Sequence, residues 1–146
     1  MKLHQLLPLA ALALLRAFGC KKEDQSGVPL TAVDISINVN LPEYNHLTSV
    51  GGWVYLTGGS EGLIVYRKSI DEFTAMDRHC PVQPADLCKV TVDADGILAV
   101  DTTCCHCGFL LQNGSLALNP GNVSGAGSGL KLYNTTFNGA TLHIFN

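Results

Sequence analysis

Five of the six cysteines lie close together in the sequence, and this clustering constrains the fold more than any other feature. They form a first group of two and a second group of three within four residues: Cys80, Cys88, Cys104, Cys105 and Cys107. Cysteines that only fill an apolar core are dispersed along strands, whereas these stand in loop-like segments beside Pro81 and Gly108. A short hairpin pattern separates the two groups, so we expect two cysteine-bearing loops at the same end of one β domain.

The remainder of the chain alternates apolar and polar residues with a period of two. Ile35, Ile37 and Val39 alternate with polar residues, as in a half-buried strand. Further short apolar runs fall at residues 53–56, 63–66, 73–76, 90–92, 97–100, 115–118, 130–133 and 141–145. Turn sequences separate them, among them Gly58–Gly62, which we interpret as a hairpin loop, and Asn138-Gly139. The pattern predicts an all-β, antiparallel sandwich or barrel.

The first 20 residues have the pattern of an export segment. Lys2 precedes an apolar run from Leu6 to Leu15, which is too short to span a bilayer but long enough for the apolar part of a signal peptide. Gly19-Cys20 resembles a bacterial lipoprotein cleavage site, which implies a lipid on Cys20, with simple secretion as the alternative. We therefore divide the chain into a signal peptide (1–19), a lipid-anchored tether (20–32) and one domain (33–146).

The export pattern implies a location in the bacterial cell envelope, with the membrane as a partner through the lipid. Lys22-Glu23-Asp24 resembles the short acidic tag that directs some lipoproteins outward, so we expect the outer membrane or the cell surface. The chain has 9 basic and 12 acidic side chains, and removal of Lys2 and Arg16 would leave about −5. No basic patch remains, so nucleic acid is not an expected partner. We find no catalytic constellation and predict no enzymatic activity.

The cysteine loops carry a resemblance to a known family. The run from Phe73 to Pro81 resembles the approach to the first cluster loop of Rieske domains, and Cys104–Gly108 resembles their second loop. Pro120-Gly121 and the strand-like residues 130–133 are similar to the family's proline loop and the strand after it. The resemblance covers roughly residues 33–146. It implies a Rieske-like antiparallel β-sandwich or barrel, a two-loop subdomain for a [2Fe–2S] cluster, and one-electron transfer.

The ligand positions depart from that family's pattern, in which each loop gives one Cys and one His. Cys80 and Cys104 stand at the two Cys positions, but Val82 and Cys107 occupy the two His positions. The family counterpart of Cys88 forms a disulfide between the loops. A site with four thiolates from Cys80, Cys88, Cys104 and Cys107 would suit a [2Fe–2S] cluster or Zn²⁺, and the cluster would have a low potential.

Three alternatives to this ligand set remain open. His79 and His106 are reserve ligands, although each neighbours a cysteine and adjacent residues of an extended segment point to opposite sides. Zinc usually takes closely spaced cysteine pairs, and only Cys104 and Cys107 have that spacing. In an oxidising compartment, Cys80 or Cys88 could instead form a disulfide with a second-loop cysteine.

Two functions follow from these alternatives. The first is an envelope [2Fe–2S] protein that passes electrons to an unidentified protein partner. The second is a Rieske-like fold without a cluster, held together by disulfides or zinc, which serves as a structural or binding lipoprotein.

Overall fold

A computed structural model describes residues 27–123 and 128–146. The predicted signal peptide, Cys20 and most of the predicted tether lie outside these ranges. Within them, no helix is long and apolar enough to cross a membrane.

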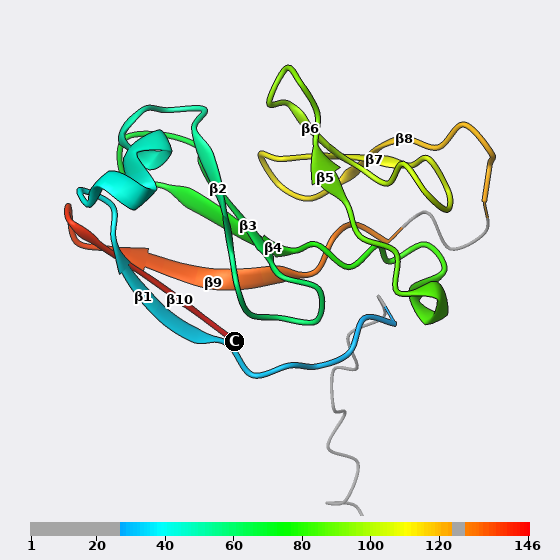
Figure 1. Cartoon of the computed structure of the whole chain (residues 1–146), viewed down its shortest axis with the longest axis horizontal. Helices are drawn as coiled ribbons and strands as arrows, with labels where there is room; N and C mark the ends of the chain where they lie inside the picture. Colours follow the sequence, from blue (N-terminus) through cyan, green and yellow to red (C-terminus); the bar gives the residue numbers. More distant parts are fainter. Residues whose placement is uncertain (1–26, 124–127) are drawn as a thin grey trace, which may run out of the picture.

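The domain is all-β, as predicted, and its strands form two antiparallel sheets (Figure 1). The larger sheet has six strands in the order β1-β10-β9-β4-β3-β2. Their bounds are β1 (Asp34–Asn38), β2 (Trp53–Leu56), β3 (Leu63–Arg67), β4 (Phe73–Asp77), β9 (Leu132–Phe137) and β10 (Thr141–Phe145). The smaller sheet has the order β5-β6-β7-β8. Its strands are β5 (Thr91–Val92), β6 (Leu98–Val100), β7 (Gly108–Leu110) and β8 (Leu116–Leu118).

Two short 3₁₀ helices interrupt the strands, and the sequence pattern did not predict either of them. They are η1 (Pro42–Thr48), between β1 and β2, and η2 (Pro84–Asp86), between β4 and β5. Each begins with a proline, whose fixed φ is compatible with the first turn of a helix. The segments are too short for a helical hydrophobic period to be visible in the sequence.

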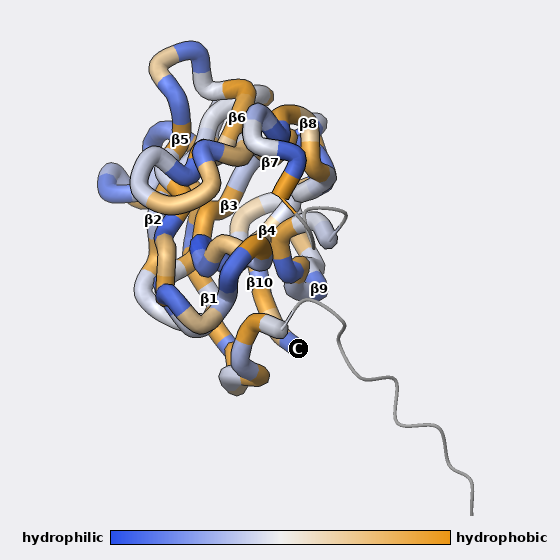
Figure 2. The backbone as a smooth tube through the Cα atoms, turned by 90° about the vertical axis from the view of Figure 1, so that its right-hand side faces the viewer, coloured by the Kyte–Doolittle hydropathy of each residue, from blue (hydrophilic) through white to orange (hydrophobic). Residues whose placement is uncertain are grey.

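The larger sheet buries both faces of its central strands. On β3, Leu63 and Val65 face one core while Ile64 faces the other, because successive side chains of a strand alternate between faces. The first core lies within the curled six-stranded sheet and includes Leu142 and Ile144 of β10. The second lies between that sheet and the smaller one, as the two groups of strands in Figure 2 indicate.

This arrangement determines where the cysteine loops lie. The first loop (residues 78–90) leads from β4 of the larger sheet to β5 of the smaller sheet, and the second (residues 101–107) joins β6 to β7. Their cysteines belong to the second core, together with Met76 and Phe109. The two loops therefore meet between the sheets, as the spacing of the cysteines had predicted.

Candidate functional site

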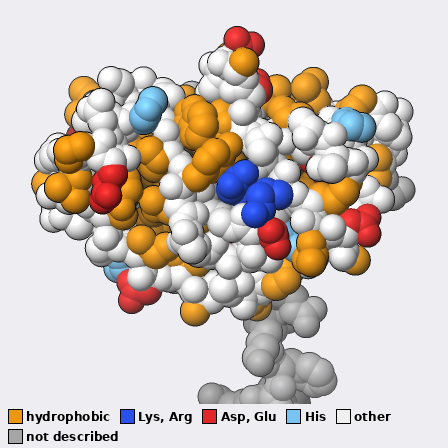
Figure 3. Space-filling view, viewed as in Figure 1, with side chains coloured by type: hydrophobic (Ala, Val, Ile, Leu, Met, Phe, Trp, Pro, Cys, Tyr) orange, Lys and Arg blue, Asp and Glu red, His pale blue; other side chains and the backbone are white. Residues whose placement is uncertain are grey.

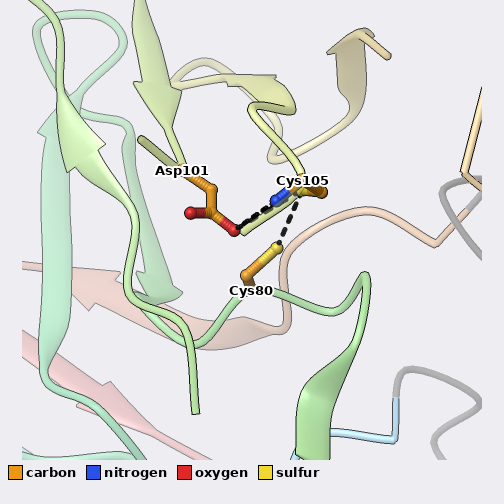
Figure 4. Close-up of side chains that lie close together, drawn as sticks. All are labelled: Cys80, Asp101 and Cys105. Carbon is orange, nitrogen blue, oxygen red and sulfur yellow. Dashed lines mark hydrogen bonds between the residues drawn. The ribbon is translucent and has the colours of Figure 1, made fainter. Parts of the chain in front are cut away.

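The cysteines of the two loops form two close pairs, and each pair takes one member from each loop. The Sγ atoms of Cys80 and Cys105 lie 3.6 Å apart, and both residues are buried. Cys88 and Cys104 are joined by a disulfide. Figure 4 shows Cys80 and Cys105 pointing toward each other, with Asp101 beside them. The loops are thus linked once by a covalent bond and once by a contact between two thiols.

The four predicted ligands do not gather into one group of free thiols in this structure. Cys88 and Cys104 are bonded to each other, and Cys80 lies in a close pair of free thiols with Cys105. The Sγ of Cys107 lies 3.6 Å from the carbonyl oxygen of Cys105 and 3.8 Å from Oδ1 of Asn119. The partner of Cys80 is Cys105, which the predicted set did not include.

Asp101 lies between the two pairs, and sequence reasoning missed it. A carboxylate oxygen of Asp101 lies within 4.8 Å of both sulfurs in each pair, so each pair and Asp101 form a group that could hold a metal ion. The Asp101 side chain accepts backbone hydrogen bonds from Thr103 and Cys104, both at 2.9 Å, and from Cys105 at 3.4 Å. An aspartate two to four residues before the amides that it accepts is typical of a tight turn, and this spacing was the available signal.

The bonds to Asp101 explain why neighbouring cysteines reach different partners. They bend residues 101–105 into a turn, so Cys104 and Cys105 do not simply point to opposite sides of an extended segment. The next residue, His106, adopts a left-handed backbone conformation with φ +55° and continues the bend. The backbone N–H of Cys107 then donates to the Sγ of Cys105 at 3.3 Å.

Burial raises the pKa of the acidic groups at this site, and at Asp101 hydrogen bonds oppose it. Burial alone would raise the pKa of Asp101, but the backbone amides of Cys104, Thr103 and Cys105 outweigh it and lower that pKa. Burial raises the pKa of Cys80 above its ordinary value and that of Cys107 to about 12. At neutral pH the site therefore combines an ionised Asp101 carboxylate with a protonated Cys80 thiol, and a metal ion would have to displace that proton.

The two reserve histidines lie in different environments, and neither belongs to the groups of possible metal ligands among the described residues. His79 is buried, with Nδ1 2.8 Å from the Ser60 hydroxyl and Nε2 2.8 Å from the Pro84 carbonyl oxygen. Both ring nitrogens are engaged, so His79 cannot bind a metal without losing one of these bonds. The side chain of His106 is exposed.

A buried carboxylate ties the first cysteine loop to the larger sheet. Asp77, at the end of β4, accepts backbone hydrogen bonds from Ser60 at 2.7 Å, His79 at 2.9 Å and Glu61 at 3.2 Å. The hydroxyl of Tyr133 on β9 donates to it at 2.8 Å. These bonds fix the hairpin loop between β2 and β3 against the start of the cysteine loop, which sets the position of Cys80.

Comparisons with models of known protein families, with curated proteins and with solved structures gave no match.

Proposed function

We propose that this chain is a Rieske-like iron–sulfur module of the bacterial cell envelope that transfers single electrons. In this proposal the ligands of a [2Fe–2S] cluster are the two cross-loop pairs, Cys80 with Cys105 and Cys88 with Cys104, in the state with four thiols. Cys105 takes the place that the sequence had suggested for Cys107. The lipid on Cys20 would hold the module at the membrane, near a redox partner protein.

The observation that supports this proposal is the two-by-two arrangement of the sulfurs. A two-iron cluster needs two protein ligands at each iron, and here two pairs, each contributed by both loops, lie around one carboxylate. The donor set fits a chain in which Cys88 and Cys104 are thiols that have not yet formed a disulfide, because four thiolates are an established ligand set for such clusters. When bound, the cluster would supply a one-electron couple.

The protein's own residues would position and tune that couple. Asp101 holds the turn of the second loop through the backbone amides of Cys104 and Cys105, and the amide of Cys107 donates to the sulfur of Cys105. The ionised Asp101 adds negative charge beside the thiolates, which favours the more oxidised state. Replacing Asp101 with Asn should therefore raise the reduction potential.

A second candidate function applies to the state with the disulfide intact. In that state the free thiols of Cys80 and Cys105 form a group with the carboxylate of Asp101, and their ligand atoms all lie within 4.8 Å of one another. Thiolate and carboxylate groups are ordinary Zn²⁺ ligands, so this group could hold one Zn²⁺ ion together with a water or a fourth protein group. The domain would then be a structural or binding lipoprotein without redox activity.

Metal and sulfide analysis of the full chain, purified from bacterial membranes without oxygen, distinguishes the two candidates. The first predicts about two iron atoms and two acid-labile sulfides per chain, with visible absorption from thiolate-to-iron charge transfer. The second predicts about one Zn²⁺ per chain, no visible colour and a Cys88–Cys104 disulfide. A chain without metal under these conditions would exclude both.

Two serine variants show which thiols are ligands. Cys105→Ser should abolish iron or zinc binding, whereas Cys107→Ser is the matched control because Cys107 lies in the same loop but outside both pairs. Loss of metal in Cys107→Ser with retention in Cys105→Ser would favour the original set of Cys80, Cys88, Cys104 and Cys107.

A further inference from the structure

The first cysteine loop also borders a second feature of the molecule, through Arg78 and Lys89. It is a cleft of about 540 Å³ formed by the end of β2, the hairpin loop 57–62 and the side chains of Arg78 and Lys89. Its volume falls within the range of small-molecule sites in proteins. Figure 3 shows Lys and Arg side chains gathered near the middle of this face, with an acidic side chain beside them.

The side chain of Arg78 is held in place, but its two terminal nitrogens have no hydrogen-bond acceptor among the described residues. Its Nε donates to the Val90 carbonyl oxygen at 3.0 Å, and its guanidinium carbon lies 3.9 Å from the centre of the Tyr55 ring. Among the residues that the structure describes, none accepts a hydrogen bond from its two terminal nitrogens. A fixed guanidinium with free terminal nitrogens is preorganised for the two oxygens of a carboxylate or phosphate.

The placement of the positive charges also favours an anion here. Of the basic residues in the described ranges, Arg67 donates to carbonyl oxygens, including that of Leu47 at 2.7 Å, and Lys131 donates to that of Pro29 at 3.2 Å. Lys89 lies at the cleft, paired with Glu61 at 3.2 Å, and its side chain is 43% exposed. A chain with a net charge of −3 thus places two cations beside one cleft.

We propose that this cleft binds a small organic anion through a carboxylate or phosphate group. The terminal nitrogens of Arg78 contact two of its oxygens, and Lys89 turns from Glu61 to supply the second positive charge. The hairpin loop 57–62 forms the wall of the cleft. None of the thiols belongs to this site, so anion binding can be tested independently of the metal centre.

Calorimetric titration of the full chain with inorganic phosphate, and separately with glutarate, tests the site. We expect saturable binding of at least one of them, with tighter binding of phosphate indicating a phosphorylated ligand and tighter binding of glutarate a carboxylic acid. Arg78→Gln should weaken that binding about tenfold or more, since it removes a charged bidentate contact. Lys89→Gln should weaken it less. Lys68→Gln is the matched control, because Lys68 is exposed and lies away from the cleft.

Lys89→Glu keeps the test decisive if Arg78→Gln does not fold. Lys89 is exposed, so reversal of its charge should leave the fold intact, as circular dichroism can verify, and should abolish binding. The proposal is overturned if neither anion binds at concentrations up to about 10 mM, which would detect even a weak, millimolar affinity. It is also overturned if Lys89→Glu binds the anion as tightly as the unchanged chain.

Discussion

The two sheets of this domain are held together in different ways. The six-stranded sheet has strands of four to six residues, and the described residues of the core inside it are aliphatic and aromatic and include no cysteine. The four-stranded sheet has strands of two or three residues, and Cys80, Cys88, Cys105 and Cys107 belong to the core beneath it. A disulfide connects its two loops.

This difference shows how a small sheet can carry a chemical site. Two-residue and three-residue strands form few ladder hydrogen bonds and cover little apolar area, so they contribute little stability by themselves. The bond between Cys88 and Cys104 and the turn around Asp101 restrict the loops instead. The larger sheet provides a rigid platform, and the smaller sheet depends on the chemistry of its cysteines.

The largest expected effect is in the core of the larger sheet. Leu142 on β10 is fully buried, so Leu142→Ala should lower the free energy of unfolding by about 2–5 kcal/mol through lost burial and a new cavity. Urea unfolding should give the same loss with and without a thiol reductant. A loss that changes with the reductant would show that the two sheets are not stabilised separately.

Removal of the disulfide should have a smaller and more local effect. The bond closes a loop with a sequence separation of 16. The double variant Cys88→Ser, Cys104→Ser should therefore lower the free energy of unfolding by about 3 kcal/mol. Hydrogen exchange should accelerate in β5–β8 and change little in β1, β9 and β10. Uniform acceleration in both sheets would contradict the proposed division.

Asp77 joins the two regions, and its replacement tests that connection. In Asp77→Asn, an NH₂ group would face backbone N–H groups that now donate hydrogen bonds to the carboxylate. We therefore expect the free energy of unfolding to fall by about 1–3 kcal/mol. Asp71→Asn is the control, because Asp71 is exposed, and should change stability little. Equal losses in both variants would mean that the bonds to Asp77 do not hold the loops.

The effect that is smallest at neutral pH, because it appears only in alkaline solution, concerns Cys107. Burial raises the pKa of Cys107 from 9.0 to about 12, so the folded state keeps a proton that the unfolded state releases. This contribution to stability is fully present below pH 9.0 and is lost as the pH rises toward 12. Urea unfolding of the metal-free chain between these limits should show a shallower decline in Cys107→Ala than in the unchanged chain. Identical declines would argue against a buried, protonated Cys107.

Most of the fold could be predicted because its signals are local. The alternation at Ile35 and Ile37, the run at residues 63–66 and the turn at Asn138-Gly139 each correspond to observed strands or hairpins. The convergence of the two loops also followed from their position around a hairpin. The family resemblance and the lipid anchor remain predictions.

The pairing within the site could not be predicted in the same way. Whether Cys104 or Cys105 faces Cys80 depends on the turn that Asp101 imposes through its backbone hydrogen bonds, and this turn has no hydrophobic period. The cleft beside Arg78 depends on contacts between residues far apart in the sequence, such as that with Tyr55. Sequence pattern predicts which strands form, whereas these contacts depend on how the loops fold back.

X-ray absorption at the iron edge is the sharpest test of the ligand assignment, because it counts the atoms bound to the metal. On the full chain purified without oxygen, we expect iron surrounded only by sulfur, with a second iron nearby, and loss of this signal in Cys105→Ser. Iron bound mainly by nitrogen or oxygen, or an unchanged sulfur environment in Cys105→Ser, would contradict the assignment of the two cross-loop pairs as its ligands.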